Sequence, residues 1–273
     1  MMADASDATP PRSLPASPLV ASLAARQDAL EARLDDLEVL AEDAGVPASP
    51  LAGALRADPP AHPLPAGPPE SSFVDVSSPV VRRLNDWMLR RGAVTPAVFV
   101  RVPAQYYDED LHFRAACVAS ATAAARVDVA QLCKTICMEN TKCTERTNAD
   151  ASNPRWILVL VQYTARLNQQ KLDKFLHERA NRAKAAAGLP PIPKSKFHAR
   201  LARDEDSERI TGYKSGGVTP FAAAEEAPVL VSDQIGIEGG EAWLGGGETD
   251  LKMRVRVEDA VRALGAEVVD CTY

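Results

Sequence analysis

A lysine inside an apolar segment is the first residue of this sequence whose type and place suggest chemistry. Lys134 lies between Leu132 and Ile136 in the stretch Val129 to Met138, which we expect to be a strand. A buried ammonium loses its hydration, so such a lysine is costly unless it is paired or used. The alternative is a lysine at a strand edge that keeps its head in water.

A glycine-rich loop follows further along the chain. Residues 211–220 read TGYKSGGVTP, with Gly216 and Gly217 ahead of Thr219 and Pro220. Glycines let the backbone approach a ligand closely, and amides presented in this way can hold a carbonyl oxygen or an oxyanion. A glycine pair before a strand can equally be a simple turn, so this loop is only suggestive by itself.

A second glycine cluster, WLGGG, contains Gly245, Gly246 and Gly247. Triple glycine invites a phosphate-binding interpretation. However, no Gly-x-Gly-x-x-Gly opens a helix here and no Walker lysine follows. A nucleotide-dependent enzyme built on these glycines is therefore the least favoured of the functions considered.

The sequence lacks the motifs of a metal site, of a Cys-x-x-Cys redox centre and of a serine hydrolase. The four histidines are scattered, no Cys-x-x-Cys occurs and no Gly-x-Ser-x-Gly elbow is present. An odd number of cysteines without paired spacing also argues against a disulfide framework. We therefore expect no metal, no other cofactor and no disulfide. The five cysteines are Cys117, Cys133, Cys137, Cys143 and Cys271.

Positive charge is concentrated in one stretch of an acidic chain. The net charge is −6, yet ten Lys/Arg and only two acidic residues lie between Arg166 and Arg203. Clustered basic charge is typical of a protein that binds a phosphate backbone. The alternative is an ordinary solvated helix face. The candidate phosphate-binding residues are Lys171, Lys174, Arg179, Arg182, Lys194 and Lys196.

The first 72 residues differ in composition from the rest. Twelve of the 21 prolines lie before residue 70, so we expect disorder over residues 1–16 and a Pro/Ala-rich linker over 46–72. Between them, residues 17–45 predict an amphipathic helix in which Leu23, Leu30 and Leu37 repeat every seven residues. Such a helix would dock on a partner or self-associate, although a frayed, solvated helix is an equal alternative.

The remaining chain predicts an α/β domain with a mixed, barrel-like sheet and flanking helices. Residues 73–127 read as its helical amino-terminal part, with a possible short strand at Val98–Val102. From residue 128 onward, strands alternate with helices. The expected strands are Val129–Met138, Trp156–Tyr163, Val229–Ser232, Lys252–Val257 and Glu267–Asp270, and the expected helices are Asn168–Ala187, Lys194–Ala202 and Glu258–Leu264.

The amino terminus carries acids and no apolar core, and no apolar run approaches the length of a membrane span. A cytoplasmic protein without a membrane partner is the expectation.

Four motifs occur in an order that resembles a known family. They are KTI at Lys134–Ile136, ITGYKSGGVTP at Ile210–Pro220, PVLVSD at Pro228–Asp233 and WLGGGETDLKMRV at Trp243–Val255, and a closing helix leads to EVVD at Glu267–Asp270. This combination closely resembles the YbaK/prolyl-tRNA editing domain family of trans-acting aminoacyl-tRNA deacylases. The segment YTARLN, Tyr163–Asn168, looks like its eukaryotic branch. The resemblance covers about 145 residues from residue 128 onward (128–273), can be extended upstream to Tyr106, and leaves the first 70 residues outside.

The resemblance implies roles for particular residues. Lys134 would contact the aminoacyl-tRNA end, and the loop from Gly216 to Pro220, including Gly217 and Thr219, would hold the aminoacyl group through its backbone. Asp233 and the glycines Gly245, Gly246 and Gly247 match positions that line the family's pocket. The resemblance implies that water or a group of the substrate performs the attack, without a protein nucleophile or metal, and this sequence agrees in offering neither a catalytic triad nor a metal cluster.

Two functions follow as hypotheses. The first is an editing enzyme that hydrolyses mischarged tRNA, most readily Ala- or Cys-tRNA(Pro), with the basic stretch on the tRNA. A pocket that sorts by size rejects a smaller amino acid poorly, because one methylene is worth only about 1–3 kcal/mol. A second, hydrolytic site restores fidelity. The other hypothesis is a non-catalytic adaptor that binds tRNA or a synthetase through the helix at residues 17–45.

Overall fold

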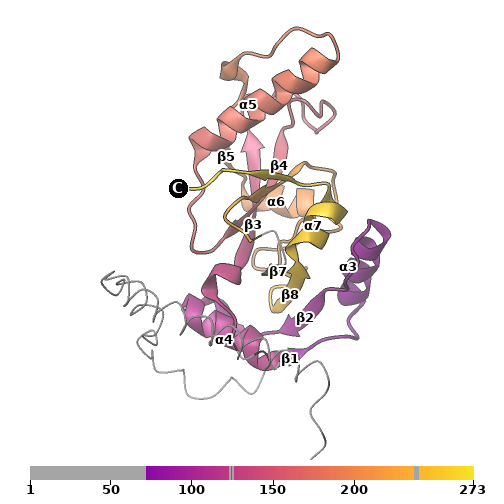
Figure 1. Ribbon diagram of the computed structural model, residues 1–273, viewed down its shortest axis with the longest axis vertical. Helices are drawn as coiled ribbons and strands as arrows, with labels where there is room; N and C mark the ends of the chain where they lie inside the picture. The colour runs from indigo at the N-terminus through magenta and orange to yellow at the C-terminus, as the bar shows by residue number, and fades with distance from the viewer. Residues whose placement is uncertain (1–71, 123, 125, 237–239) are drawn as a thin grey trace, which may run out of the picture. The chain divides into compact units, whose positions relative to one another are not determined.

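The computed structural model describes residues 72–122, 124, 126–236 and 240–273 (Figure 1). The predicted disordered segment, the helix at residues 17–45 and the linker, apart from Ser72, lie outside the described residues.

Two β-sheets form the frame of the domain. One has the order β1-β2-β8-β7 and is antiparallel; the other has the order β5-β3-β4-β6-β9 and is mixed, because β6 runs parallel to both β4 and β9. The strands are β1 (Phe73–Val74), β2 (Val98–Arg101), β3 (Cys133–Asn140), β4 (Trp156–Gln162), β5 (Ala199–Leu201), β6 (Val229–Ser232), β7 (Glu241–Gly245), β8 (Leu251–Arg256) and β9 (Glu267–Val269).

Helices flank these sheets. They are α3 (Pro79–Arg90), α4 (Leu111–Ala121), α5 (Gln169–Ala186), α6 (Asp204–Thr211) and α7 (Val257–Leu264), with 3₁₀ turns η1 (Ala104–Tyr107), η2 (Val129–Gln131) and η3 (Lys194–Lys196). The predicted α/β fold with a mixed sheet and flanking helices is confirmed. None of the helices in the described part of the chain is both long and apolar enough to cross a membrane.

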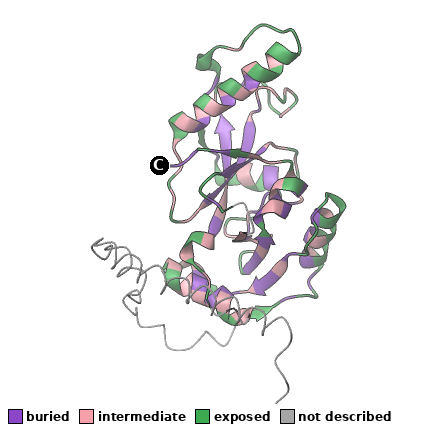
Figure 2. Ribbon diagram, in the orientation of Figure 1, coloured by how far each residue is buried: buried purple, intermediate pink, exposed green. Residues whose placement is uncertain are grey.

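The strand predicted at Trp156–Tyr163 is the centre of the mixed sheet. In β4, residues Trp156 to Val161 are all buried, as expected for a strand covered on both faces. One face packs against Leu172 and Leu176 of α5. Figure 2 shows this contrast between buried strands and the exposed outer face of α5.

Local signals place the ends of the helices. The Ser78 side chain accepts from the Val80 amide at the start of α3, and the Asn168 side chain accepts from two amides at the start of α5. Gly265 closes α7 in the left-handed conformation that glycine adopts at low cost.

Tertiary pairing overrides the predicted helix at Lys194–Ala202. Only Lys194–Lys196 forms a helical turn, and the chain then extends as β5, where Ala199 pairs with Asn140 of β3. The Ala199 amide also donates to Asp173 of α5 at 2.7 Å. The pairing with β3 and the hydrogen bond to Asp173 join residues that are distant in the sequence, so a local sequence pattern does not predict them.

The predicted strand at Val129–Met138 begins later than expected. Asp128 and Gln131 form a capping box around η2, and the strand starts at Cys133. In the region at residues 73–127, the short strand considered at Val98–Val102 is present as β2, which together with β1 joins β8 in one sheet. The helix α6 and the strand β7 were not predicted.

Candidate functional site

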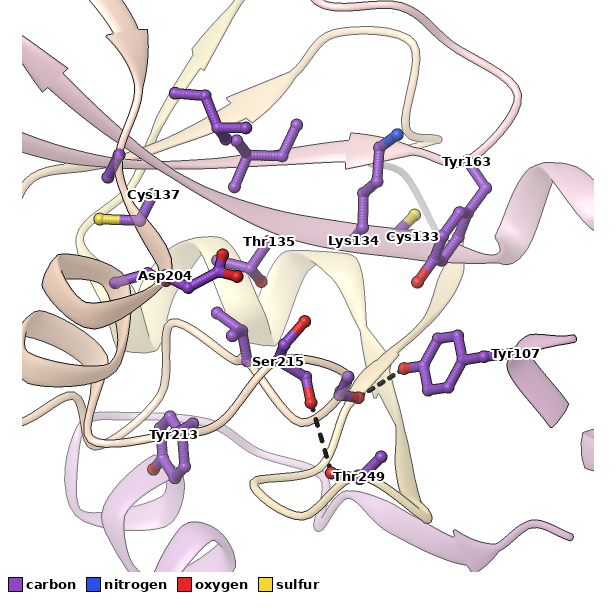
Figure 3. A pocket seen from close by; sticks show the side chains of 17 residues that line it. Tyr107, Cys133, Lys134, Thr135, Cys137, Tyr163, Asp204, Tyr213, Ser215 and Thr249 are labelled. Atoms are coloured by element: carbon purple, nitrogen blue, oxygen red, sulfur yellow. Dashed lines mark hydrogen bonds between the residues drawn. The ribbon is translucent and has the colours of Figure 1, made fainter. Parts of the chain in front are cut away.

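A cavity of about 550 Å³ lies between β3 and the loop that follows α6 (Figure 3). Because β5 pairs with β3 only over Met138–Asn140, the preceding stretch of β3 is left to form a wall. The lining residues are Tyr107, Cys133, Lys134, Thr135, Ile136, Cys137, Tyr163, Leu201, Ala202, Asp204, Ser207, Tyr213, Ser215, Gly216, Val218, Gly245 and Thr249.

The structure places Lys134 at this cavity. Its side chain is half-buried on β3, opposite Val161 of β4. The ammonium nitrogen lies 5.4 Å from the centre of the Tyr163 ring, within the range of a cation–π contact. Lys134 is therefore neither fully buried nor free in solvent, and it borders the cavity.

Gly216 lines the same cavity and belongs to the loop that follows α6. Its φ of +84° suits glycine, and a Cβ here would lie 3.0 Å from side-chain atoms of both Tyr107 and Thr249. Gly217 does not line the cavity: its amide donates to the Lys214 carbonyl at 2.9 Å, and a Cβ would meet the Glu248 backbone at 2.8 Å.

The second glycine cluster packs against this loop. Gly245 lines the cavity, and a Cβ on it would lie 2.4 Å from the Val218 carbonyl oxygen. Gly246 packs on Leu251, and the Gly247 amide donates to the Gly217 carbonyl. The glycines thus permit two backbone segments to touch, and only Gly245 borders the cavity.

The other predicted pocket residues lie elsewhere. Thr219 is fully buried, and its hydroxyl contacts the Met253 sulfur at 3.5 Å. Pro220 lines a separate cavity of about 350 Å³ near Trp87. Asp233 is exposed after β6, where its carboxylate accepts a hydrogen bond from Gln234.

Lys252 is the main residue that the sequence did not reveal. It is 3% exposed, and its ammonium nitrogen donates to the Tyr107 hydroxyl at 2.8 Å, the Gly216 carbonyl at 2.9 Å and the Thr249 carbonyl at 2.7 Å. Three acceptors match the three protons of an ammonium. In sequence it looked like an ordinary strand lysine, because two of its partners, Tyr107 and Gly216, are distant from it along the chain.

Burial governs the titration of this group. Desolvation lowers the pKa of Lys252 to about 7, while the charge of Asp250 acts in the opposite direction. Burial also raises the pKa of Tyr107, so its hydroxyl keeps a proton and donates it to the Gly216 carbonyl. The Gly216 carbonyl thus receives two hydrogen bonds, one from Tyr107, which lines the cavity, and one from the buried Lys252.

Two cysteines line the cavity without being suited to attack. Burial raises the pKa of the Cys133 and Cys137 thiols to about 12. Because the thiolate is the nucleophilic form, these thiols are unreactive near neutral pH. No group of three or more potential metal ligands occurs within the described ranges.

Half of the predicted phosphate-binding residues have acidic partners. Lys171 lies 2.7 Å from Asp270, Lys174 lies 4.0 Å from Glu178, and Arg179 pairs with Glu267. Arg182 stacks over Phe175 at 6.0 Å. Lys194 and Lys196 are exposed in η3 and form no ion pair with any residue that the structure describes.

No family model and no curated protein matches the chain. Solved structures similar to it include a scaffold protein from work on epitope backbone grafting by computational design (22% identity, 72% of this chain, 98% of that chain, TM-score 0.47). A proposed trans-editing enzyme for prolyl tRNA synthetase (23%, 72%, 99%, 0.47) and the hypothetical protein APE2540 (20%, 70%, 99%, 0.46) are also similar. Likenesses this distant carry no conclusion about function, which has to come from the site.

Proposed function

We propose that the chain is a trans-acting aminoacyl-tRNA deacylase whose substrate is a mischarged tRNA, most readily Ala- or Cys-tRNA(Pro). One observation carries the proposal. Lys134 and Gly216, which the motif resemblance assigns to substrate binding, border one cavity from two different elements. Because the two residues are far apart in the sequence, we would not expect them to border the same cavity if their roles were unrelated.

The cavity has the size and lining for the aminoacyl end of a tRNA. Its volume of about 550 Å³ falls in the range of small-ligand sites, about 300–1,000 Å³. Lys134 beside Tyr163 offers a cation for a phosphate and a ring face for a sugar or base. The basic stretch from Arg166 to Arg203 includes Leu201 and Ala202, which line the cavity, and we assign its exposed charge to the rest of the acceptor stem.

The reaction is the hydrolysis of an ester. Water adds to the carbonyl carbon, the bond from that carbon to the ribose oxygen breaks, and the ribose oxygen leaves with a proton. Negative charge develops on the carbonyl oxygen during this step, and backbone amides can stabilise it. The Gly217 amide is bonded to the Lys214 carbonyl, so we assign this role to the amides of Gly216 and Val218, because these two residues line the cavity.

The loop is held in place before substrate arrives. Lys252 and Tyr107 bind the Gly216 carbonyl. Arg101 bonds to Asp75, Glu248 and Asp250, which anchors the neighbouring turn. Such preorganisation lowers the cost of forming the transition state.

The test is a deacylation panel with the purified full chain. The substrates are tRNA(Pro) charged with alanine, cysteine or proline, with Ser- and Thr-charged tRNAs added. We expect rapid loss of one mischarged species while Pro-tRNA is spared. Lys134→Ala should reduce kcat/KM by about 100-fold, the scale of losing one charged contact to the reacting region.

Lys142→Ala is the matched control, because Lys142 is an exposed lysine just beyond the same strand. It should retain full activity, and thermal unfolding should show that both variants are folded. Absence of hydrolysis across the panel by a folded protein would contradict the proposed function. Full activity in Lys134→Ala would remove the role given to Lys134.

A further inference from the structure

The cavity wall carries one lysine and one aspartate. Of the described residues that line it, Lys134 supplies the single Lys or Arg side chain, and Asp204 supplies the single Asp or Glu. The role of Lys134 was expected from the sequence motifs. Asp204 belongs to none of them.

The two charged side chains lie apart, on opposite sides of β3 (Figure 3). Asp204 is the first residue of α6, and the Ala202 amide just before it donates to the Cys137 carbonyl at 2.9 Å. Cys137 is three residues along β3 from Lys134, roughly 10 Å at the rise of a strand. In Figure 3, Asp204 lies beside Cys137 and Thr135, while Lys134 lies beside Tyr163.

Asp204 differs from the acidic residues next to it. Asp206 is paired with Arg203 at 3.3 Å and Arg209 at 3.5 Å. Glu205 is exposed and does not line the cavity. Asp204 is exposed at the cavity and makes no ion pair with a residue of the described ranges, so its carboxylate is available to a ligand.

We propose that Asp204 binds the free α-ammonium group of the aminoacyl ester, so that the site selects substrates with an unblocked amine. This inference rests on the proposed deacylase function and specifies its substrate class. An aminoacyl-tRNA end carries an ammonium on one side of the ester and a phosphodiester on the other. The cavity lining carries the acid and the cation at separate places, which favours a single orientation of the substrate.

Two serine hydroxyl groups of the same cavity complete the proposed acceptor set. Ser207 and Ser215 also line this cavity. An ammonium has several N–H donors, and a carboxylate with two hydroxyl oxygens can accept them. An amide nitrogen, as in an N-acetylated or peptidyl ester, has no charge and one donor, so it gains little from Asp204.

The test compares alanyl-tRNA(Pro) with its N-acetylated form. With the unblocked substrate, Asp204→Asn should raise KM about tenfold and leave kcat nearly unchanged, because the contact forms before the reaction. With the acetylated substrate, the variant and the unaltered protein should have the same KM. Rates are taken relative to uncatalysed hydrolysis, because acetylation changes the reactivity of the ester.

Glu205→Gln is the control, since it removes a charge from the same turn of α6 without touching the cavity. It should behave as the unaltered protein does. If Asp204→Asn still discriminates between the two substrates, or if Glu205→Gln loses discrimination equally, the role of Asp204 is overturned while the deacylase function stands. If the unaltered protein hydrolyses neither substrate, the deacylase function fails and this inference fails with it.

Discussion

Positive charge at the cavity wall and in the stretch from Arg166 to Arg203 is used differently. At the wall, Lys252 is buried and each of its protons meets an acceptor. In the basic stretch, Lys171 and Arg179 are partly exposed and pair with surface acids. Surface pairs of this kind are worth about 0–1 kcal/mol. Lys252 therefore helps to determine the local structure, whereas the surface cations remain able to exchange their acids for phosphates.

Counting charges along the chain did not reveal this difference. The basic stretch was conspicuous because its ten cations lie close together in sequence. Lys252 was not, because Tyr107, Gly216 and Thr249 converge on it from separate elements. The comparison shows that the position of a cation in the fold, more than the number of cations in a stretch of sequence, indicates which part of the cavity wall is fixed by hydrogen bonds.

The largest expected effect comes from breaking the packing of the wall. Gly245→Ala would place a Cβ 2.4 Å from the Val218 carbonyl oxygen and 2.9 Å from the Gly217 backbone. Backbone atoms cannot rotate away as a side chain can, so we expect a loss of about 3 kcal/mol in the free energy of unfolding. Urea denaturation would measure it.

Gly236→Ala is the matched control, because a Cβ there would meet nothing within 4 Å. Its free energy of unfolding should stay within about 0.5 kcal/mol of the unaltered protein. Equal stability of Gly245→Ala and Gly236→Ala would show that the two loops are not held as tightly as the structure indicates.

A second prediction concerns pH and Lys252. Its pKa is about 7 in the folded state against 10.5 when unperturbed. Between these values the unfolded chain binds the proton that the folded protein releases, so the free energy of unfolding should rise with pH. The rise should be about 2 kcal/mol from pH 7 to 8.5, and the same contribution is lost as pH falls back toward 7.

Lys252→Met isolates this contribution. In this variant the free energy of unfolding should no longer rise between pH 7 and 8.5. In Lys171→Met, which removes a partly exposed lysine, it should still rise. The window stops at pH 8.5 because buried thiols such as Cys133, whose pKa is raised from 9.0, act in the opposite direction above it. Identical slopes in all three proteins would mean that Lys252 does not titrate in this range.

The fold was largely predictable because its signals are local. The apolar run of β4 and the caps of α3 and α5 each occupy a few adjacent residues. The strand β5 was missed because it depends on pairing with β3. The helix α6 was missed because its eight residues are mostly polar, which gives a weak apolar period.

The lining of the cavity was predictable only where a motif marked a residue. Lys134 and Gly216 lay in recognisable segments and do border the cavity. Asp204 and Tyr107 lay in none, and nothing local marks a residue as facing a distant strand. Gly246 and Gly247 belong to a motif but pack away from the cavity, since glycine serves close packing and ligand approach by the same lack of a side chain.

The smallest predicted effect is on tRNA affinity, and it distinguishes cations of the basic stretch that pair with acids from cations that do not. The double variant Lys194→Ala/Lys196→Ala should weaken tRNA binding about three- to tenfold and reduce the slope of log affinity against log salt by about 2, one for each phosphate that is no longer neutralised. The double variant Lys171→Ala/Lys174→Ala should change the affinity and the salt slope less. In the unaltered protein these two lysines must first leave Asp270 and Glu178 before they can bind a phosphate. Binding titrations at several salt concentrations would measure both slopes. Equal losses would show that surface pairing does not restrain these lysines, and no loss in either variant would place the tRNA on another face.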